Sequence, residues 1–197
     1  MSAFTEEPAA FAPAYGKRLG RQIRASPYFV VNTLNRDFVG TRGFSIVFRR
    51  ESIPRVEREF PFLSPYLQRS LRADCNAFYL NPLELVRGSR VDPHIDRSLR
   101  SYVVHVDPPL AVSVLYVEVP SAMRGGELEL RRGKKLIARI TPTENTLVTF
   151  AGDLTHSIAR LDTDGARLSV VCEQYGLTPD ELERVPPYAI ETRARYA

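Results

Sequence analysis

The stretch Val91-Asp92-Pro93-His94-Ile95-Asp96-Arg97-Ser98 places an imidazole and a carboxylate two residues apart, at His94 and Asp96. On an extended segment, residues two apart point to the same side, so these two side chains can bind one metal ion together. A single His-x-Asp pair is weak evidence for a site. The rest of the chain must supply the other ligands and a fold that brings them together.

The length of 197 residues predicts one domain, residues 1–197, large enough to bury a core without disulfides. The composition is that of an ordinary globular protein. No apolar run reaches the length of a membrane span and the N-terminus does not resemble a signal peptide, so we expect a cytoplasmic protein with no membrane partner. Cys75 and Cys172 form no Cys-x-x-Cys motif and are expected to be buried and unpaired.

Positive charge is concentrated in the first half of the chain. Residues 1–100 contain 16 basic and 10 acidic residues, whereas residues 101–197 contain 11 and 13. Of the 27 basic residues 24 are arginine, which suits planar recognition of carboxylate or phosphate. Two interpretations stay open: a solvated surface, or a region that recruits an anionic substrate. The chain has no long basic run, zinc motif or RNP-like motif, so nucleic acid is not favoured as a partner.

The first 75 residues predict helices and short strands after a tail at residues 1–10. Helices are expected over residues 11–25, 53–60 and 66–72, and strands over residues 28–31 and 43–48. In the first helix, Tyr15, Leu19 and Ile23 share one face. Ser64 is expected to cap the third helix, with Pro65 at its first position.

From residue 76 the pattern changes to short apolar runs separated by turns, including a turn at Gly88-Ser89. These runs cover residues 78–80, 83–86, 102–106, 111–119, 127–130, 136–140, 146–150, 156–160 and 166–173. Strands at this spacing predict a sandwich or jelly roll. Thr178-Pro179-Asp180-Glu181 is a capping box that predicts one short C-terminal helix.

The chain therefore divides into a helical and strand-containing support region (1–75), a strand-rich core (76–175) and a C-terminal appendage (176–197). The expected fold is mainly β, of the α+β class, with the N-terminal helices packed on one sheet.

His156 opens a late strand, and a jelly roll brings early and late strands together. His94, Asp96 and His156 would then form a set of two imidazoles and one carboxylate, which binds Fe(II) and leaves coordination positions open. Arg167 starts the next strand, 11 residues after His156. We expect the two strands to be antiparallel neighbours, so that the guanidinium lies beside the same cavity and can bind a carboxylate. Ser169 could add a hydroxyl to that carboxylate.

In this order, His94-x-Asp96, His156 and Arg167-Leu168-Ser169 resemble the Fe(II)/2-oxoglutarate-dependent dioxygenases. Gly125-Gly126-Glu127-Leu128 looks like a segment of the prolyl-4-hydroxylase-like branch. The resemblance covers roughly residues 76–175 and implies a double-stranded β-helix, or jelly roll.

The resemblance implies a role for each of these residues. The metal ligands would be His94, Asp96 and His156, with no further catalytic side chain, and Arg167 would bind the far carboxylate of 2-oxoglutarate beside Ser169. A tyrosine also often helps to hold 2-oxoglutarate in this branch. Here Tyr79 or Tyr116 would have to serve, and either could equally be a core aromatic.

The implied reaction uses 2-oxoglutarate and O₂ to hydroxylate an aliphatic carbon of a small molecule or of a peptidyl residue such as proline. The presence of Asp96 argues against a halogenase, which lacks that carboxylate. Two alternatives are a cupin-type metalloenzyme with the same ligands but no 2-oxoglutarate, and a non-catalytic jelly-roll binding protein. A nucleic-acid demethylase is disfavoured because the paired arginines after the distal histidine are missing.

Three other polar residues near the motif have two interpretations each. His105 lies among valines and is predicted to be an interior residue and not a ligand. Arg97 and Arg100 follow the metal motif, and either contact an anionic substrate at the mouth of the site or are solvated. The primary substrate itself is left open.

Overall fold

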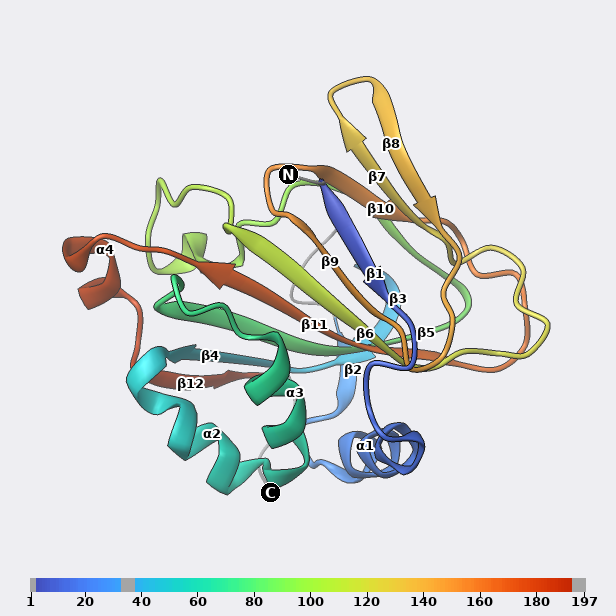
Figure 1. The fold of residues 1–197 in the computed structure, drawn as a ribbon, viewed down its shortest axis with the longest axis horizontal. Coiled ribbons are helices and arrows are strands. Elements are labelled where there is room, and N and C mark those ends of the chain that lie inside the picture. The colour runs from blue at the N-terminus through green and yellow to red at the C-terminus, as the bar shows by residue number, and fades with distance from the viewer. Residues whose placement is uncertain (1–2, 33–37, 193–197) are drawn as a thin grey trace.

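In the computed structural model, which describes residues 3–32 and 38–192, the strands form one curled antiparallel sheet (Figure 1). The strands are Phe4–Glu7 (β1), Val30–Asn32 (β2), Phe38–Gly43 (β3), Ser45–Arg49 (β4), Ala77–His94 (β5), Ala111–Glu118 (β6), Leu128–Arg132 (β7), Lys135–Ile140 (β8), Leu147–Ala151 (β9), Thr155–Ile158 (β10), Arg167–Tyr175 (β11) and Tyr188–Glu191 (β12). The helices are Pro13–Ala25 (α1), Ile53–Glu59 (α2), Ser64–Ser70 (α3) and Pro179–Arg184 (α4).

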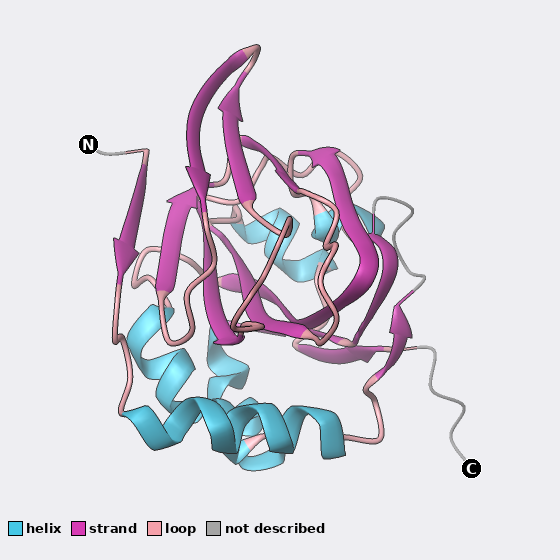
Figure 2. Cartoon of the chain, turned by 90° about the vertical axis from the view of Figure 1, so that its right-hand side faces the viewer, coloured by secondary structure: helices cyan, strands magenta, loops and turns pink. Residues whose placement is uncertain are grey.

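The strand order is β1-β9-β6-β11-β5-β10-β7-β8, with β3 and β4 also on β5, β2 on β3, and β12 on β4. This is the mainly β jelly roll that the sequence predicts. The β7–β8 hairpin projects beyond the body of the molecule (Figures 1 and 2). Gly133, at φ +58°, makes its turn as predicted.

Strand β5 joins the two layers of the roll. Its first half, Ala77 to Leu85, pairs with β11, whereas Val91 and His94 pair with β10. Gly88 lies between the halves with φ +90°, a conformation that favours glycine. The sequence predicted a turn at Gly88-Ser89 between separate strands. The structure instead continues one strand through the bend, and the bend lets its two halves belong to different layers.

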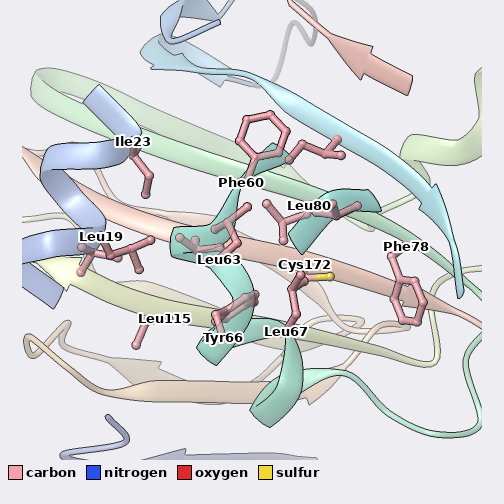
Figure 3. Packing of buried hydrophobic residues seen from close by; sticks show 14 of the residues in the cluster. Leu19, Ile23, Phe60, Leu63, Tyr66, Leu67, Phe78, Leu80, Leu115 and Cys172 are labelled. Atoms are coloured by element: carbon pink, nitrogen blue, oxygen red, sulfur yellow. The ribbon is translucent and has the colours of Figure 1, made fainter. Parts of the chain in front are cut away.

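The N-terminal helices cover one face of the sheet, as predicted (Figure 2). The residues of the helices that fill this core include Leu19, Ile23, Leu63 and Leu67, and those of the strands include Leu80, Leu115 and Cys172 (Figure 3). Burying such side chains supplies most of the favourable free energy of folding. This cluster thus lies between the helices and the outer face of the roll, and the inner face of the same strands is left for the site.

Helix α1 is also held by charge. Arg24 donates two hydrogen bonds to Glu118, at 2.7 and 2.8 Å, and one to Glu84 at 2.7 Å. Glu84 is buried and also pairs with Arg42 at 3.3 Å. Glu84 accepts from two arginines, one on each carboxylate oxygen, and this offsets part of the cost of burying it.

Two segments expected to be irregular are strands instead. The expected tail contains β1, which pairs with β9 from Phe4 opposite Phe150 to Glu7 opposite Leu147. After the predicted C-terminal helix, whose capping box at Thr178 is confirmed, β12 pairs with β4. Both strands are short and join the sheet at positions that local sequence does not mark, so pairing partners decide their conformation.

The expected strand at residues 102–106 is wrong. A 3₁₀ helix, Ser98–Ser101, is followed there by turns. Val103 and Val106 are buried while Val104 and His105 are exposed, a spacing of three that fits a turn and not a strand. His105 is therefore a surface residue, not the interior residue that its valine neighbours predicted.

Smaller expectations divide in the same way. Ser64 is the first residue of α3 and donates to Glu57 at 2.6 Å, so it does not act as the predicted N-cap. Cys75 and Cys172 are buried and free, as predicted. None of the described helices combines the length and apolar character needed to cross a membrane.

Candidate metal centre

His94, Asp96 and His156 form one cluster in which the potential ligand atoms all lie within 4.8 Å of one another. His94 is the last residue of β5 and is the register partner of His156 on β10. Asp96 follows two residues after the strand ends. The ladder between β5 and β10 therefore brings together the histidines that are far apart in sequence, as the jelly-roll prediction requires.

The hydrogen bonds of both imidazoles fix their tautomers. Nδ1 of His94 lies 2.8 Å from the Asp92 carbonyl oxygen, and Nδ1 of His156 lies 3.2 Å from the Leu154 carbonyl oxygen. A carbonyl only accepts, so each Nδ1 carries a proton, and in the neutral imidazole each Nε2 then presents a lone pair. The two Nε2 atoms face Asp96, at 3.2 Å from Oδ1 and 3.4 Å from Oδ2.

These atoms fit a divalent cation. Burial lowers the pKa of His156, which favours the neutral imidazole that binds metals. Burial opposes ionisation of Asp96, but the two imidazoles outweigh it and hold the pKa of its carboxyl below the usual value. Asp96 Oδ2 has no hydrogen-bond partner among the described residues. Ligand atoms on adjacent positions of a first-row metal lie about 3 Å apart, close to the spacing found here.

The cluster opens into a cavity of about 320 Å³ inside the roll. Its walls combine apolar residues with a few polar ones, the usual character of a small-molecule site. The lining includes Leu83, Val114, Leu128 and Phe150 on the apolar side, and Asn81, Arg167, Ser169 and Glu173 on the polar side.

Arg167 is 1% exposed and has no ion pair among the described residues. Its Nη1 donates to the Gly126 carbonyl at 2.7 Å, its guanidinium carbon lies 4.9 Å from the centre of the Tyr116 ring, and its Nε has no partner. Burial lowers the pKa of this guanidinium, which still remains charged. A buried cation without an acid partner is costly unless a ligand supplies the negative charge.

Two further buried hydroxyls near Arg167 lack partners in the described structure, Tyr116 Oη and Ser169 Oγ. Ser169 lies opposite Tyr116 in the β6–β11 ladder and on the same face of β11 as Arg167. The three side chains therefore present unsatisfied donors to one region, and a carboxylate would accept from all of them.

The predicted route by which Arg167 reaches the cavity is wrong. Strand β10 pairs with β5 and β7, whereas β11 pairs with β5 and β6, so the two strands are not neighbours. Arg167 and His156 line the same cavity because β5 bends between the layers that contain them.

No protein-family profile and no curated protein sequence matches this chain. Its structure matches a crystal structure of a Pseudomonas putida prolyl-4-hydroxylase with a TM-score of 0.62 at 16% identity, over 90% of this chain and 95% of that one. A Trichoplax adhaerens prolyl hydroxylase in complex with a hypoxia inducible factor peptide fragment gives 0.59 at 15% identity, over 93% and 86%. A 2OG-Fe(II) oxygenase family oxidoreductase from Burkholderia pseudomallei gives 0.55 at 14% identity, over 89% and 86%.

The chain has the fold of the 2OG-Fe(II) oxygenases. The predicted jelly roll and the predicted likeness to prolyl-4-hydroxylases are confirmed at the level of the fold. Within this fold, the Gly125-Gly126 segment forms a tight turn beside Arg167. Both glycines have positive φ, and a Cβ on Gly125 would lie 1.8 Å from the Arg160 carbonyl oxygen. This tight turn presents the Gly126 carbonyl to Arg167.

The two tyrosines differ in their surroundings. Tyr79 lines the cavity, but its hydroxyl accepts a hydrogen bond from Ser45 at 2.7 Å. Tyr116 is fully buried against Arg167, and its hydroxyl has no partner among the described residues. Of the two, Tyr116 has the hydroxyl that lacks a partner in the described chain, beside the guanidinium.

Sequence reasoning missed Glu173, a buried acid in the cavity wall. Burial, together with the charge of Asp96, raises the pKa of Glu173 to about 8. The alternation of β11 contains the signal: Arg167, Ser169, Val171 and Glu173 are two residues apart and therefore share one face.

Proposed function

We propose that this protein is an Fe(II)- and 2-oxoglutarate-dependent oxygenase. One observation carries the proposal: a single buried cavity contains a two-histidine, one-carboxylate cluster and a buried arginine without an acid partner in the described chain. The cluster supplies three ligands for Fe(II), and the arginine supplies a cation for the far end of a dicarboxylate.

The residues of the chain divide the work between them. When bound, Fe(II) and 2-oxoglutarate would supply oxygen-transfer chemistry driven by oxidative decarboxylation of the co-substrate. His94, Asp96 and His156 hold the metal and leave its other positions open. Arg167, Ser169 and Tyr116 hold the far carboxylate, which orients the co-substrate toward the metal. The apolar walls at Leu128 and Phe150 exclude water, which strengthens these electrostatic contacts.

The substrate would enter where the cavity meets solvent. Arg97 and Arg100 line this part of the cavity and are exposed, beside Ile95 and Phe38. Hydroxylation of an aliphatic carbon, in a small molecule or in a peptidyl residue such as proline, is the reaction we propose. Its support is the likeness to prolyl hydroxylases, one of them in complex with a peptide fragment. The exposed arginines favour a substrate that carries negative charge.

Two other functions would each leave one feature of the cavity unexplained. A cupin-type metalloenzyme without 2-oxoglutarate has no use for a buried, unpaired arginine. A non-catalytic binding protein has no use for a three-ligand cluster with neutral Nε2 atoms facing a carboxylate. Retaining both features is costly for stability, which favours the oxygenase.

Binding of 2-oxoglutarate to the Mn(II)-loaded protein tests this proposal without turnover. Calorimetry should show that wild type binds 2-oxoglutarate and binds pyruvate, which lacks the far carboxylate, much more weakly. Arg167→Ala should weaken the binding of 2-oxoglutarate on the order of 100-fold, because a charge-assisted bidentate contact is lost. It should leave pyruvate and Mn(II) binding nearly unchanged.

Arg160→Ala is the matched control. Arg160 is an exposed arginine that pairs with Asp162 at 3.4 Å, and its removal should change neither affinity. A wild-type protein that binds Mn(II) but does not distinguish 2-oxoglutarate from pyruvate contradicts the proposal. So does loss of Mn(II) in the Arg167 variant, since that would make the arginine part of the metal site.

A further inference from the structure

Of the three side chains in the metal cluster, the Asp96 carboxylate is held least firmly by the fold. His94 and His156 are fixed by the β5–β10 ladder, but Asp96 lies beyond the end of β5, in the loop that leads to β6. Its Oδ2 has no hydrogen-bond partner among the described residues. The position of Asp96 in the metal-free chain therefore depends on what fixes the backbone of this loop.

Ser98, two residues after Asp96, is where the loop is attached to the sheet. Its backbone N–H donates to Glu173 Oε2 at 3.2 Å and to Tyr175 Oη at 3.1 Å, and its hydroxyl donates to Glu173 Oε1 at 2.5 Å. Tyr175 Oη also donates to Glu173 Oε2. Glu173 and Tyr175 come from the same face of β11 and are buried, whereas Ser98 is partly exposed, so the loop is attached through acceptors that the sheet holds in place.

Burying the carboxyl of Glu173 in this attachment costs free energy. Glu173 has no ion pair among the described residues, and the nearby charge of Asp96 is of the same sign. A well-packed apolar side chain at such a position usually gives equal or greater stability. Apolar packing of Leu99 beside Tyr175 already holds the next residue of the loop. The carboxyl of Glu173 therefore fixes the orientation of Ser98, because it accepts hydrogen bonds from both the N–H and the hydroxyl of that residue.

We propose that Glu173, together with Tyr175, is a positioning residue that holds Asp96 in place for the metal, through Ser98. This inference rests on the proposed metal site. Without the attachment the loop can shift, and the carboxylate must be reordered each time a metal binds. Residues that orient metal ligands from outside typically change metal affinity on the order of 10- to 100-fold.

Replacement of Glu173 by two different residues separates the effect of its hydrogen bonds from that of its ionisable carboxyl. Glu173→Leu removes every acceptor for Ser98, and Co(II) or Mn(II) affinity should fall at least about 10-fold. Glu173→Gln removes the ionisable carboxyl but can keep the contacts: its oxygen accepts from Ser98 N–H and Tyr175 Oη, while its NH₂ donates to Ser98 Oγ, which can also accept. The Gln variant should therefore retain metal affinity within a few-fold of wild type.

Glu84→Leu is the matched control, because Glu84 is an equally buried acid on the opposite face of the sheet. It should lower the melting temperature by releasing α1, yet leave metal affinity unchanged. Tyr175→Phe provides a second test if the Leu variant does not fold. It should weaken metal binding, because it removes one contact to Ser98 and one to Glu173.

The outcomes are distinct. Weakened metal binding in the Leu variant with recovery in the Gln variant supports the inference. Equal weakening in both variants means that the ionisable carboxyl of Glu173 matters and not the geometry of its hydrogen bonds, which overturns the inference. Unchanged affinity in both, or in Tyr175→Phe, also overturns it. A folded wild-type protein that binds no divalent metal contradicts the proposed function instead, so the two failures can be told apart.

Discussion

The two faces of β11 show how stability and chemistry are separated in this molecule. One face consists of Leu168, Val170 and Cys172, which pack in the apolar core beneath the helices. Figure 3 shows Cys172 in this core. The other consists of Arg167, Ser169, Val171 and Glu173, which line the cavity. Adjacent residues of one strand thus have opposite roles, because side chains alternate between the faces of a sheet.

The comparison teaches which features of the cavity face need a functional explanation. The core face consists of apolar side chains whose burial stabilises the fold. The cavity face buries a guanidinium and a carboxyl, neither in an ion pair with a described residue, and the Ser169 hydroxyl, which has no hydrogen-bond partner in the described chain. Such groups reduce stability unless a ligand compensates them. Uncompensated polar groups on one face only are a physical sign of a binding site.

The largest expected effect comes from neighbouring substitutions on the two faces. Leu168→Ala should lower the free energy of unfolding by about 2–5 kcal/mol through a cavity in the core, and leave 2-oxoglutarate affinity unchanged. Arg167→Ala should have a smaller effect on unfolding, because it removes a buried charge that no acid balances. Chemical denaturation of the metal-free protein measures both. An Arg167 variant as unstable as the Leu168 variant would show that the two faces are not separated in this way.

A smaller effect distinguishes the two tyrosines. Tyr116→Phe should weaken the binding of 2-oxoglutarate to the Mn(II)-loaded protein about 10-fold, as expected for one lost hydrogen bond to a carboxylate. It should not destabilise the metal-free fold, since that hydroxyl has no partner in the described chain. Tyr79→Phe should show the reverse, a loss on the order of 1 kcal/mol of stability from the missing Ser45 contact, with unchanged affinity. The opposite pattern would assign the co-substrate contact to Tyr79.

The parts of the site that follow from local pattern were predictable from sequence. The spacing of His94 and Asp96, the position of His156 at the start of a strand and the Arg167-x-Ser169 alternation all depend on short-range geometry. The jelly roll followed from the regular spacing of short strands and turns, and its N-terminal helices from the spacing of Tyr15, Leu19 and Ile23.

The parts that depend on pairing partners were not predictable. Strands β1 and β12 exist because β9 and β4 offer open edges, and the segment at 102–106 is not a strand because it has no partner in the described sheet. Glu173 was missed for the same reason. Its role depends on Ser98, which lies 75 residues earlier and is brought beside it only by the fold.

The most direct test of the central claim is an anaerobic difference spectrum of the wild-type protein with Fe(II) and 2-oxoglutarate. Chelation of the iron by the co-substrate should give a weak visible charge-transfer band that requires both components. Asp96→Ala, which removes a ligand, should lose the band while remaining folded. The account predicts the band in wild type. Its absence from folded wild-type protein at saturating Fe(II) and 2-oxoglutarate would contradict the account.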